Sequence, residues 1–149
     1  MTGQALTLRL TSDPQNLCAV RGLVRAYVAA LGFDSDRTEE VVHAVDEACA
    51  NSIRHSYQGE GGRTIQLGFR HTPRWFVVEL QDGGKPAPMG LRRSRSHAAN
   101  PNEIRPGGLG LRLLYDVFDS VEYRPGKTRG NRVTMKLRRP GRSGKTDTP

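Results

Sequence analysis

The sequence predicts an α+β fold, a two-layer sandwich in which helices lie on one face of a mixed, mostly antiparallel sheet. Two observations predict it. Segments of alternating polarity and segments of helical periodicity follow each other in the order β-α-α-β-β-loop-α-β-β, and the later strands come in pairs joined by short turns. The chain has 149 residues, the size of one ordinary domain.

The first elements are a strand and a helix. From Gln4 to Leu10, three leucines alternate with other residues, which predicts a half-buried strand with its leucines inward. Asp13 and Pro14 then provide an N-cap and a first-turn proline, and apolar residues continue at helical spacing to Gly32.

The stretch from Ser35 to Gly59 is predicted to be one helix. Ser35 or Asp36 is its expected N-cap, Glu39 stands at capping-box spacing after Asp36, and Gly59 is the stop signal. Its apolar face consists of Val41, Val42, Val45, Ala48, Cys49 and Ile53. This face is large enough to hold the helix against a core.

A polar stripe lies on the other side of this helix. Glu47, Asn51 and His55 follow each other at four-residue spacing and therefore share one side. A solvated charged face would give a similar pattern. Asparagine is a mediocre helix former, however, so an asparagine in the middle of a helix suggests a binding role.

Two strands and a long loop follow. Thr64 to Arg70 and Trp75 to Gln81 are predicted to form an antiparallel hairpin, and the second strand ends in Asp82-Gly83-Gly84. The next segment, at about residues 85–107, has no periodicity and little apolar content. Long unstructured connections of this kind are typically lids or binding loops, and a disordered insertion is the alternative.

A glycine-rich turn precedes the last helix. Gly107-Gly108-Leu109-Gly110-Leu111 runs straight into an apolar helical segment. Backbone N–H groups at such a turn can approach an anion, although a tight turn alone also explains the glycines. Two more strands are predicted at residues 119–123 and 132–138, and residues 139–149 have the composition of a disordered tail.

Composition narrows the possible functions. The formal net charge is +8, and much of the excess lies in the long loop and the tail. Such charge suits a nucleotide phosphate, an acidic partner or DNA equally well. Cys18 and Cys49 lie among apolar residues and are predicted to be buried free thiols. No apolar run approaches the roughly 20 residues of a membrane span, so a cytoplasmic location is expected.

Three signals now stand in order: Glu47-x-x-x-Asn51-x-x-x-His55, Asp82-x-Gly84 and Gly108-x-Gly110. This order resembles the N, G1 and G2 boxes of the GHKL ATPase superfamily, which has the Bergerat nucleotide-binding fold. The segments EACANSIRHSY and GGLGLRLLYDVFDSVEY further resemble the anti-sigma-factor serine-kinase branch of bacterial partner-switching systems.

The resemblance implies a function. Residues 1–138 would be an ATP-binding kinase domain that uses Mg²⁺, phosphorylates a serine of a STAS-type antagonist protein and alternately sequesters a sigma factor. A homodimer is expected, without membrane association. The residues assigned to ATP binding are Asn51, Arg54, His55, Asp82, Gly84, Pro86, Arg105, Gly107, Gly108, Leu109, Gly110 and Leu111, with Glu47 catalytic and Asn51 the metal ligand.

The expected roles follow from the chemistry of the side chains. Asn51 would offer an amide oxygen to Mg²⁺, and Glu47 would accept or orient the serine proton. Asp82 would accept a hydrogen bond from the adenine amino group, or would be only a turn former. Arg105 would neutralise the terminal phosphate, or be solvated. His55 would be a phosphate contact or a structural neighbour.

Two departures from the superfamily pattern concern the pocket wall. Lys85-Pro86 stands where many members have a second glycine, and Gly130-Asn131 stands where the final strand often begins with Gly-Thr. A hydrogen bond made by that threonine must therefore be remade by the amide of Asn131 or be lost.

Two alternatives to the kinase remain. The first is a nucleotide-binding regulatory module that sequesters a partner without phosphoryl transfer; the presence of Glu47 favours the kinase over it. The second is nucleic-acid binding, which is disfavoured because the basic loop between Leu91 and Arg105 has no aromatic residue for base stacking.

Overall fold

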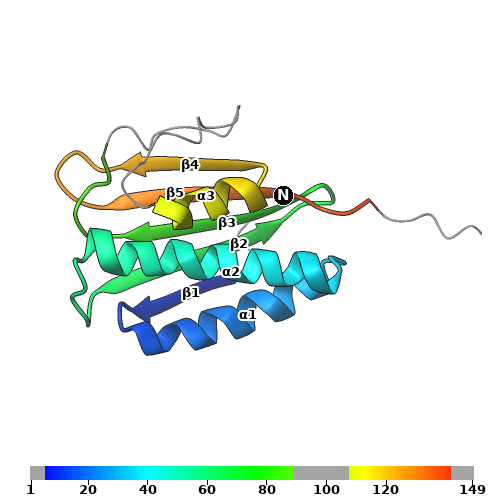
Figure 1. The fold of residues 1–149 in the computed structure, drawn as a ribbon, viewed down its shortest axis with the longest axis horizontal. Coiled ribbons are helices and arrows are strands. Elements are labelled where there is room, and N and C mark those ends of the chain that lie inside the picture. The colour runs from blue at the N-terminus through cyan, green and yellow to red at the C-terminus, as the bar shows by residue number, and fades with distance from the viewer. Residues whose placement is uncertain (1–5, 89–107, 142–149) are drawn as a thin grey trace, which may run out of the picture.

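The computed structural model describes residues 6–88 and 108–141. For residues 108–110 it describes only the backbone. Within these residues, five strands form one antiparallel sheet in the spatial order β1-β2-β3-β5-β4 (Figure 1). The strands are β1 Leu6–Thr11, β2 Thr64–His71, β3 Trp75–Asp82, β4 Ser120–Pro125 and β5 Asn131–Arg138. The register places Asp82, at the end of β3, opposite Asn131, at the start of β5.

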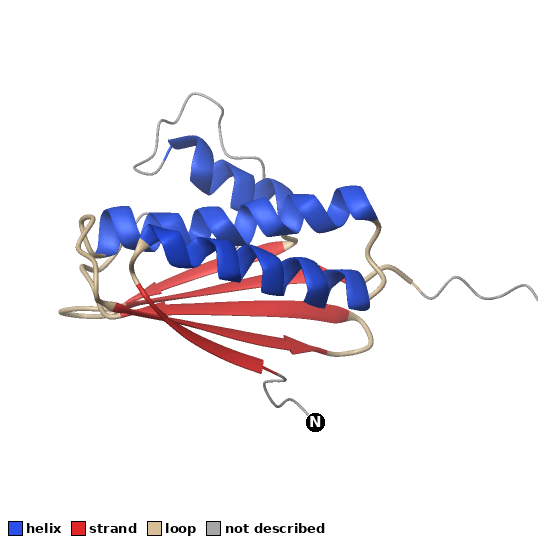
Figure 2. Ribbon diagram, turned by 90° about the horizontal axis from the view of Figure 1, so that it is seen from below, coloured by secondary structure: helices blue, strands red, loops and turns tan. Residues whose placement is uncertain are grey.

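Three helices of the described chain cover one face of this sheet (Figure 2). They are α1 Leu17–Ala30, α2 Ser35–Asn51 and α3 Gly108–Val117, and α2 packs against both of the others. The predicted α+β two-layer fold is confirmed. Of the helices in the described residues, not one combines the length and apolar character that a membrane crossing demands.

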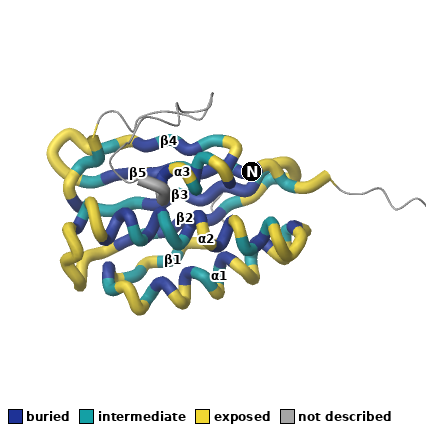
Figure 3. Tube along the Cα trace, in the orientation of Figure 1, coloured by how far each residue is buried: buried dark blue, intermediate teal, exposed yellow. Residues whose placement is uncertain are grey.

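The core lies between the two layers, and its buried residues are dark blue along the helices and the sheet in Figure 3. Val24 and Val28 of α1, Val45 of α2, and Phe69 and Phe76 of the sheet are all fully buried. Each such side chain contributes about 1.5–3 kcal/mol when removed from water. This core fixes α2 over the sheet and therefore fixes the end of α2 relative to the end of β3.

The central helix differs from the prediction at its start. The N-cap is Asp34, whose Oδ1 accepts a hydrogen bond from the backbone N–H of Arg37 at 2.7 Å; Ser35 and Asp36 lie in the first turn instead. Glu39 does not complete a capping box. It pairs with Arg25 of α1 at 2.6 Å, and the hydrogen bond from Arg25 lowers the pKa of Glu39.

The central helix also ends earlier than predicted. The α-helix stops at Asn51 and continues as a π-helical turn over Ser52–Ser56, in which the N–H of Tyr57 donates to the carbonyl of Ser52 at 3.1 Å. Gly59 has a positive φ of 79°, as expected for a glycine stop signal. The predicted single helix is thus two segments.

The cysteine prediction is right for one residue and wrong for the other. Cys49 is fully buried, and burial together with nearby Asp46 raises the pKa of its thiol to about 12. Cys18 is exposed because the buried face of α1 is formed by its neighbours Leu17 and Val20.

Candidate functional site

The end of α2 brings Glu47, Asn51 and Arg54 together. Nη2 of Arg54 donates to Oε1 of Glu47 at 2.6 Å and to Oδ1 of Asn51 at 2.8 Å. Asn51 is 8% exposed, whereas the side chains of Glu47 and Arg54 are 26% and 55% exposed. Glu47 and Asn51 therefore lie one turn apart on the same side of the helix, as the spacing predicts.

The π-helical turn changes the directions of the residues that follow Asn51. A π-helical turn is wider than an α-helical one, so a four-residue step no longer repeats the same direction. His55 is exposed, while Ser52 is buried and its hydroxyl donates to Oδ2 of Asp82 at 2.7 Å. The turn thereby aims Ser52 at the end of β3.

Asp82 is held by three hydrogen bonds. Its Oδ2 accepts from Ser52, and its Oδ1 accepts from the N–H of Gly84 at 3.0 Å and from Nδ2 of Asn131 at 3.1 Å. A carboxylate offers about four acceptor positions, so one position remains on Oδ2. Asp82 is thus fixed in orientation and keeps one acceptor for the amino group of a bound base.

Asn131 organises the pocket wall. Besides its bond to Asp82, its Nδ2 donates to Oγ of Ser56 at 3.1 Å and to the carbonyl of Lys85 at 2.9 Å, and its Oδ1 accepts from the N–H of Ala87 at 2.7 Å. The departure from Gly-Thr therefore has a structural consequence. The amide ties the loop after β3 to both Asp82 and the end of the π-helical turn.

Gly84 is needed for a contact within the chain itself. A Cβ at this position would lie 2.3 Å from the carbonyl oxygen of Ser56, which accepts a hydrogen bond from the N–H of Lys85 at 2.7 Å. The absence of a side chain at Gly84 therefore lets the loop pack against the π-helical turn.

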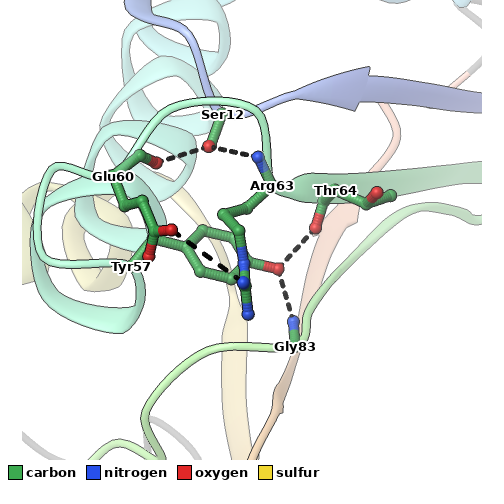
Figure 4. Close-up of polar contacts among 6 residues, drawn as sticks. All are labelled: Ser12, Tyr57, Glu60, Arg63, Thr64 and Gly83. Atoms are coloured by element: carbon green, nitrogen blue, oxygen red, sulfur yellow. Dashed lines mark hydrogen bonds and ion pairs between the residues drawn. The ribbon is translucent and has the colours of Figure 1, made fainter.

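Tyr57 fixes the same loop from the other side (Figure 4). Its hydroxyl donates to the carbonyl of Thr64 and accepts from the N–H of Gly83, each at 2.6 Å. The guanidinium of Arg63 lies 5.6 Å from the centre of the Tyr57 ring. The hydroxyl therefore links the end of the helical segment, the start of β2 and the residue after Asp82.

These elements enclose a cavity of about 380 Å³, a size typical of small-molecule sites. Five predicted binding residues line it, namely Asn51, His55, Asp82, Pro86 and Leu111. A larger cavity of about 910 Å³ lies at the other end of the sheet, beside Arg74 and Arg139, and none of the predicted site residues lines it. The convergence of the predicted residues favours the smaller cavity as the functional site.

The glycine-rich turn also reaches this cavity. Gly108 begins α3, so Gly108, Leu109 and Gly110 lie in the first turn of the helix rather than in a turn before it. Leu111 is buried and lines the cavity. The positive end of α3 therefore lies beside the pocket. Arg105, Gly107 and most of the predicted lid lie outside the described residues.

Tyr123 of β4 adds a hydroxyl that the sequence did not single out. It lines the cavity and is 7% exposed. Burial raises the pKa of Tyr123 well above its ordinary value, and the nearby Tyr115, Asp82 and Glu47 raise it further. The hydroxyl therefore stays neutral at physiological pH and can hydrogen-bond a ligand.

The donor set suits a nucleotide and a hard cation. Asp82 retains an acceptor for a base, and Glu47 and Asn51 offer oxygen atoms, the ligand type that Mg²⁺ requires. One or two protein oxygens suffice when phosphate oxygens and water complete the coordination. The residues present therefore fit a nucleotide with a bound divalent cation.

Comparisons with known proteins identify relatives of this chain. Residues 10–137 match the histidine kinase-like ATPase domain family. The serine-protein kinase RsbW of Bacillus pumilus is 24% identical over 130 residues, covering 81% of this chain and 78% of that protein. The anti-sigma F factor of a Clostridium botulinum strain is 26% identical over 131 residues, covering 88% and 92%.

A solved structure shows the same fold. The crystal structure of the RsbU and RsbW domains of a Mycobacterium tuberculosis protein superimposes with a TM-score of 0.61 at 17% identity, covering 93% of this chain and 34% of that one. The predicted GHKL resemblance is confirmed by these matches. Since the family match spans most of its length, this chain belongs to the histidine kinase-like ATPase domain family.

Proposed function

We propose that this protein is an ATP- and Mg²⁺-dependent serine kinase that acts as an anti-sigma-type partner-switching regulator. It phosphorylates a STAS-type antagonist protein and alternately sequesters a sigma factor. One observation carries the proposal: the carboxylate of Glu47 and the amide of Asn51 lie one turn apart, beside a cavity that Asn51 and Asp82 both line. The names of the relatives, a serine-protein kinase and an anti-sigma F factor, support it.

Glu47 is the proton acceptor in this proposal. The serine hydroxyl of the partner attacks the terminal phosphorus of ATP, its proton passes to the Glu47 carboxylate, and the bond to the ADP oxygen breaks. Glu47 is partly exposed at the edge of the site, so a partner side chain can reach it. A positioned general base of this type contributes about 10²–10⁴-fold to the rate.

The other residues position the nucleotide. Asp82, locked by Ser52, Gly84 and Asn131, accepts a hydrogen bond from the base. Asn51 presents its amide oxygen to the metal. When bound, Mg²⁺ neutralises phosphate charge. The backbone N–H groups at the start of α3 would donate to phosphate oxygens and add favourable potential.

One contact favours the alternative of a regulatory module without phosphoryl transfer. The guanidinium of Arg54 lies 2.6 Å from Oε1 of Glu47 and thus covers the carboxylate that would accept the proton. In this alternative, nucleotide binding controls sequestration of the partner, and the ion pair stays in place.

Labelled ATP separates the two functions. The purified chain is incubated with γ-labelled ATP, Mg²⁺ and a cognate STAS-type protein, and a serine-to-alanine variant of that protein serves as control. Label on the serine supports the kinase. ATP binding without labelled partner leaves the regulatory module, and absence of ATP binding contradicts both.

A further inference from the structure

Arg54 engages the two atoms that the proposed chemistry uses. A single nitrogen, Nη2, donates to Oε1 of Glu47 and to Oδ1 of Asn51. These oxygens are the proposed proton acceptor and the proposed metal ligand. Arg54 itself does not line the cavity, and its side chain is 55% exposed. It therefore reaches both oxygens from the solvent side and can leave without disturbing the core.

The amide of Asn51 is held in one orientation. Its Nδ2 is buried without a hydrogen-bond partner, and it is the one such side-chain atom found in the described residues. Leaving a buried donor unpaired is unfavourable. Turning the amide over would place its NH₂ group against the guanidinium, where both groups are donors. Arg54 thus keeps the amide oxygen on the side of Glu47, although Nδ2 remains unpaired.

A guanidinium and a divalent cation compete for this position. Both are positive and both seek the same lone pairs of Oδ1, so binding the metal there repels Arg54. The guanidinium also occupies Oε1 of Glu47, one of the two oxygens that could accept the proton. The same movement of Arg54 would therefore open the metal ligand and free the base.

We propose that Arg54 is a cation placeholder: its guanidinium holds Glu47 and Asn51 in the orientation that suits a cation, and the nucleotide-bound metal must displace it before Glu47 is free. This inference rests on the proposed nucleotide–metal site. It assigns Arg54 a positioning role, in contrast to the expected role as an ATP ligand.

Metal affinity tests the inference without measuring activity. The full chain is saturated with ADP and titrated with Mn²⁺, with free Mn²⁺ read by electron paramagnetic resonance. Arg54→Met removes the guanidinium and its charge but keeps an unbranched apolar stem. We expect Mn²⁺ to bind about fivefold more tightly to this variant, because an ion pair of such exposure is worth up to about 1 kcal/mol. ADP affinity in EDTA should stay within about twofold of wild type.

Two variants serve as controls. Arg54→Lys keeps the positive charge and should bind Mn²⁺ as wild type does. Arg25→Met removes an equal charge from the exposed pair with Glu39, away from the site, and should also leave Mn²⁺ affinity unchanged. Tighter binding in Arg25→Met as well would show a net-charge effect and would overturn the inference.

The outcomes separate the inference from the function on which it rests. If the wild type binds ADP and Mn²⁺ but Arg54→Met binds Mn²⁺ equally or more weakly, Arg54 is no placeholder and the nucleotide site stands. If ADP affinity in EDTA falls in Arg54→Met, Arg54 is a phosphate ligand instead. If the wild type binds neither ADP nor Mn²⁺, the proposed function fails, and the inference fails with it.

Discussion

Two asparagines with nearly equal burial differ in the hydrogen bonds of their side chains. Asn51 is 8% exposed and Asn131 is 7% exposed. Within the described residues, the side-chain amide of Asn131 has four hydrogen-bond partners, whereas that of Asn51 has one, Arg54, and its Nδ2 is unpaired. Burial alone therefore does not show what a polar residue does. The hydrogen-bonded amide of Asn131 holds the loop in place, whereas the unpaired Nδ2 of Asn51 calls for another explanation, such as binding.

The contrast extends to the two sides of the pocket. The side with Asp82 and Asn131 is closed by hydrogen bonds that involve the backbone of the loop, so it is formed before a ligand arrives. The side with Glu47 and Asn51 is joined by one exposed arginine. We infer that the first side recognises the base with little rearrangement and that the second side changes during the reaction.

The largest expected effect is on the rate of phosphorylation and concerns the side of the pocket with Glu47 and Asn51. Glu47→Gln keeps the size of the side chain but removes the proton acceptor, and it should lower the rate of serine phosphorylation by about 10²–10⁴-fold. ADP affinity should stay within about threefold, because Glu47 does not line the base pocket. Phosphorylation is measured with labelled ATP and affinity by calorimetry. An equal loss of affinity would show that Glu47 acts in binding.

Asn131→Ala tests the side of the pocket that is closed by hydrogen bonds of Asp82 and Asn131. The substitution removes the amide that bonds the N–H of Ala87, the carbonyl of Lys85 and Oδ1 of Asp82, so it should lower the free energy of unfolding by about 3 kcal/mol. Urea unfolding measures the change, and Thr134→Ala in the same strand is the control. A loss below about 1 kcal/mol would mean that the hydrogen-bond network is not needed to hold the wall.

Asn51→Ala should behave in the opposite way from Asn131→Ala. It removes an unpaired buried donor together with one hydrogen bond, so the free energy of unfolding should change by less than about 1 kcal/mol. ADP affinity in the presence of Mg²⁺ should fall about tenfold, to the value measured in EDTA, because the metal loses its amide ligand. A fall of the same size in EDTA would assign Asn51 to the nucleotide rather than to the metal.

Tyr57→Phe should have the smallest effect. It removes the hydroxyl that bridges Thr64 and Gly83, at an expected cost of about 1 kcal/mol in unfolding, with a small loss of ADP affinity. Tyr27→Phe is the matched control, because the hydroxyl of Tyr27 bonds exposed His71. Equal effects in the two variants would argue against a specific role for Tyr57 in holding the loop.

Much of the fold follows from local sequence patterns. The alternation in the strands, the proline after Asp13 and the glycine at position 59 all lie where the structure uses them. The position of Glu47 and Asn51 on the same side of the helix also follows from spacing alone. These features depend on residues close together in the sequence, which is why the sequence predicts them.

The rest depends on contacts between distant residues. Periodicity does not show that the helix becomes a π-helical turn after Asn51, because the change depends on the bond of Ser52 to the end of β3 and on the contact of Ser56 with Gly84. The role of Asn131 arises only when β5 lies beside β3. The sequence marks Asn131 as a departure from a family pattern, but its four partners come from three other segments.

The strand order has a consequence for synthesis on the ribosome. β5, the last strand of the described chain, inserts between β3 and β4, so a nascent chain that stops before Asn131 has two strands without their shared neighbour. Such a chain also lacks the amide that closes the pocket wall. Ligand binding should therefore begin only after translation has passed β5, which would keep incomplete chains from competing with finished ones for nucleotide.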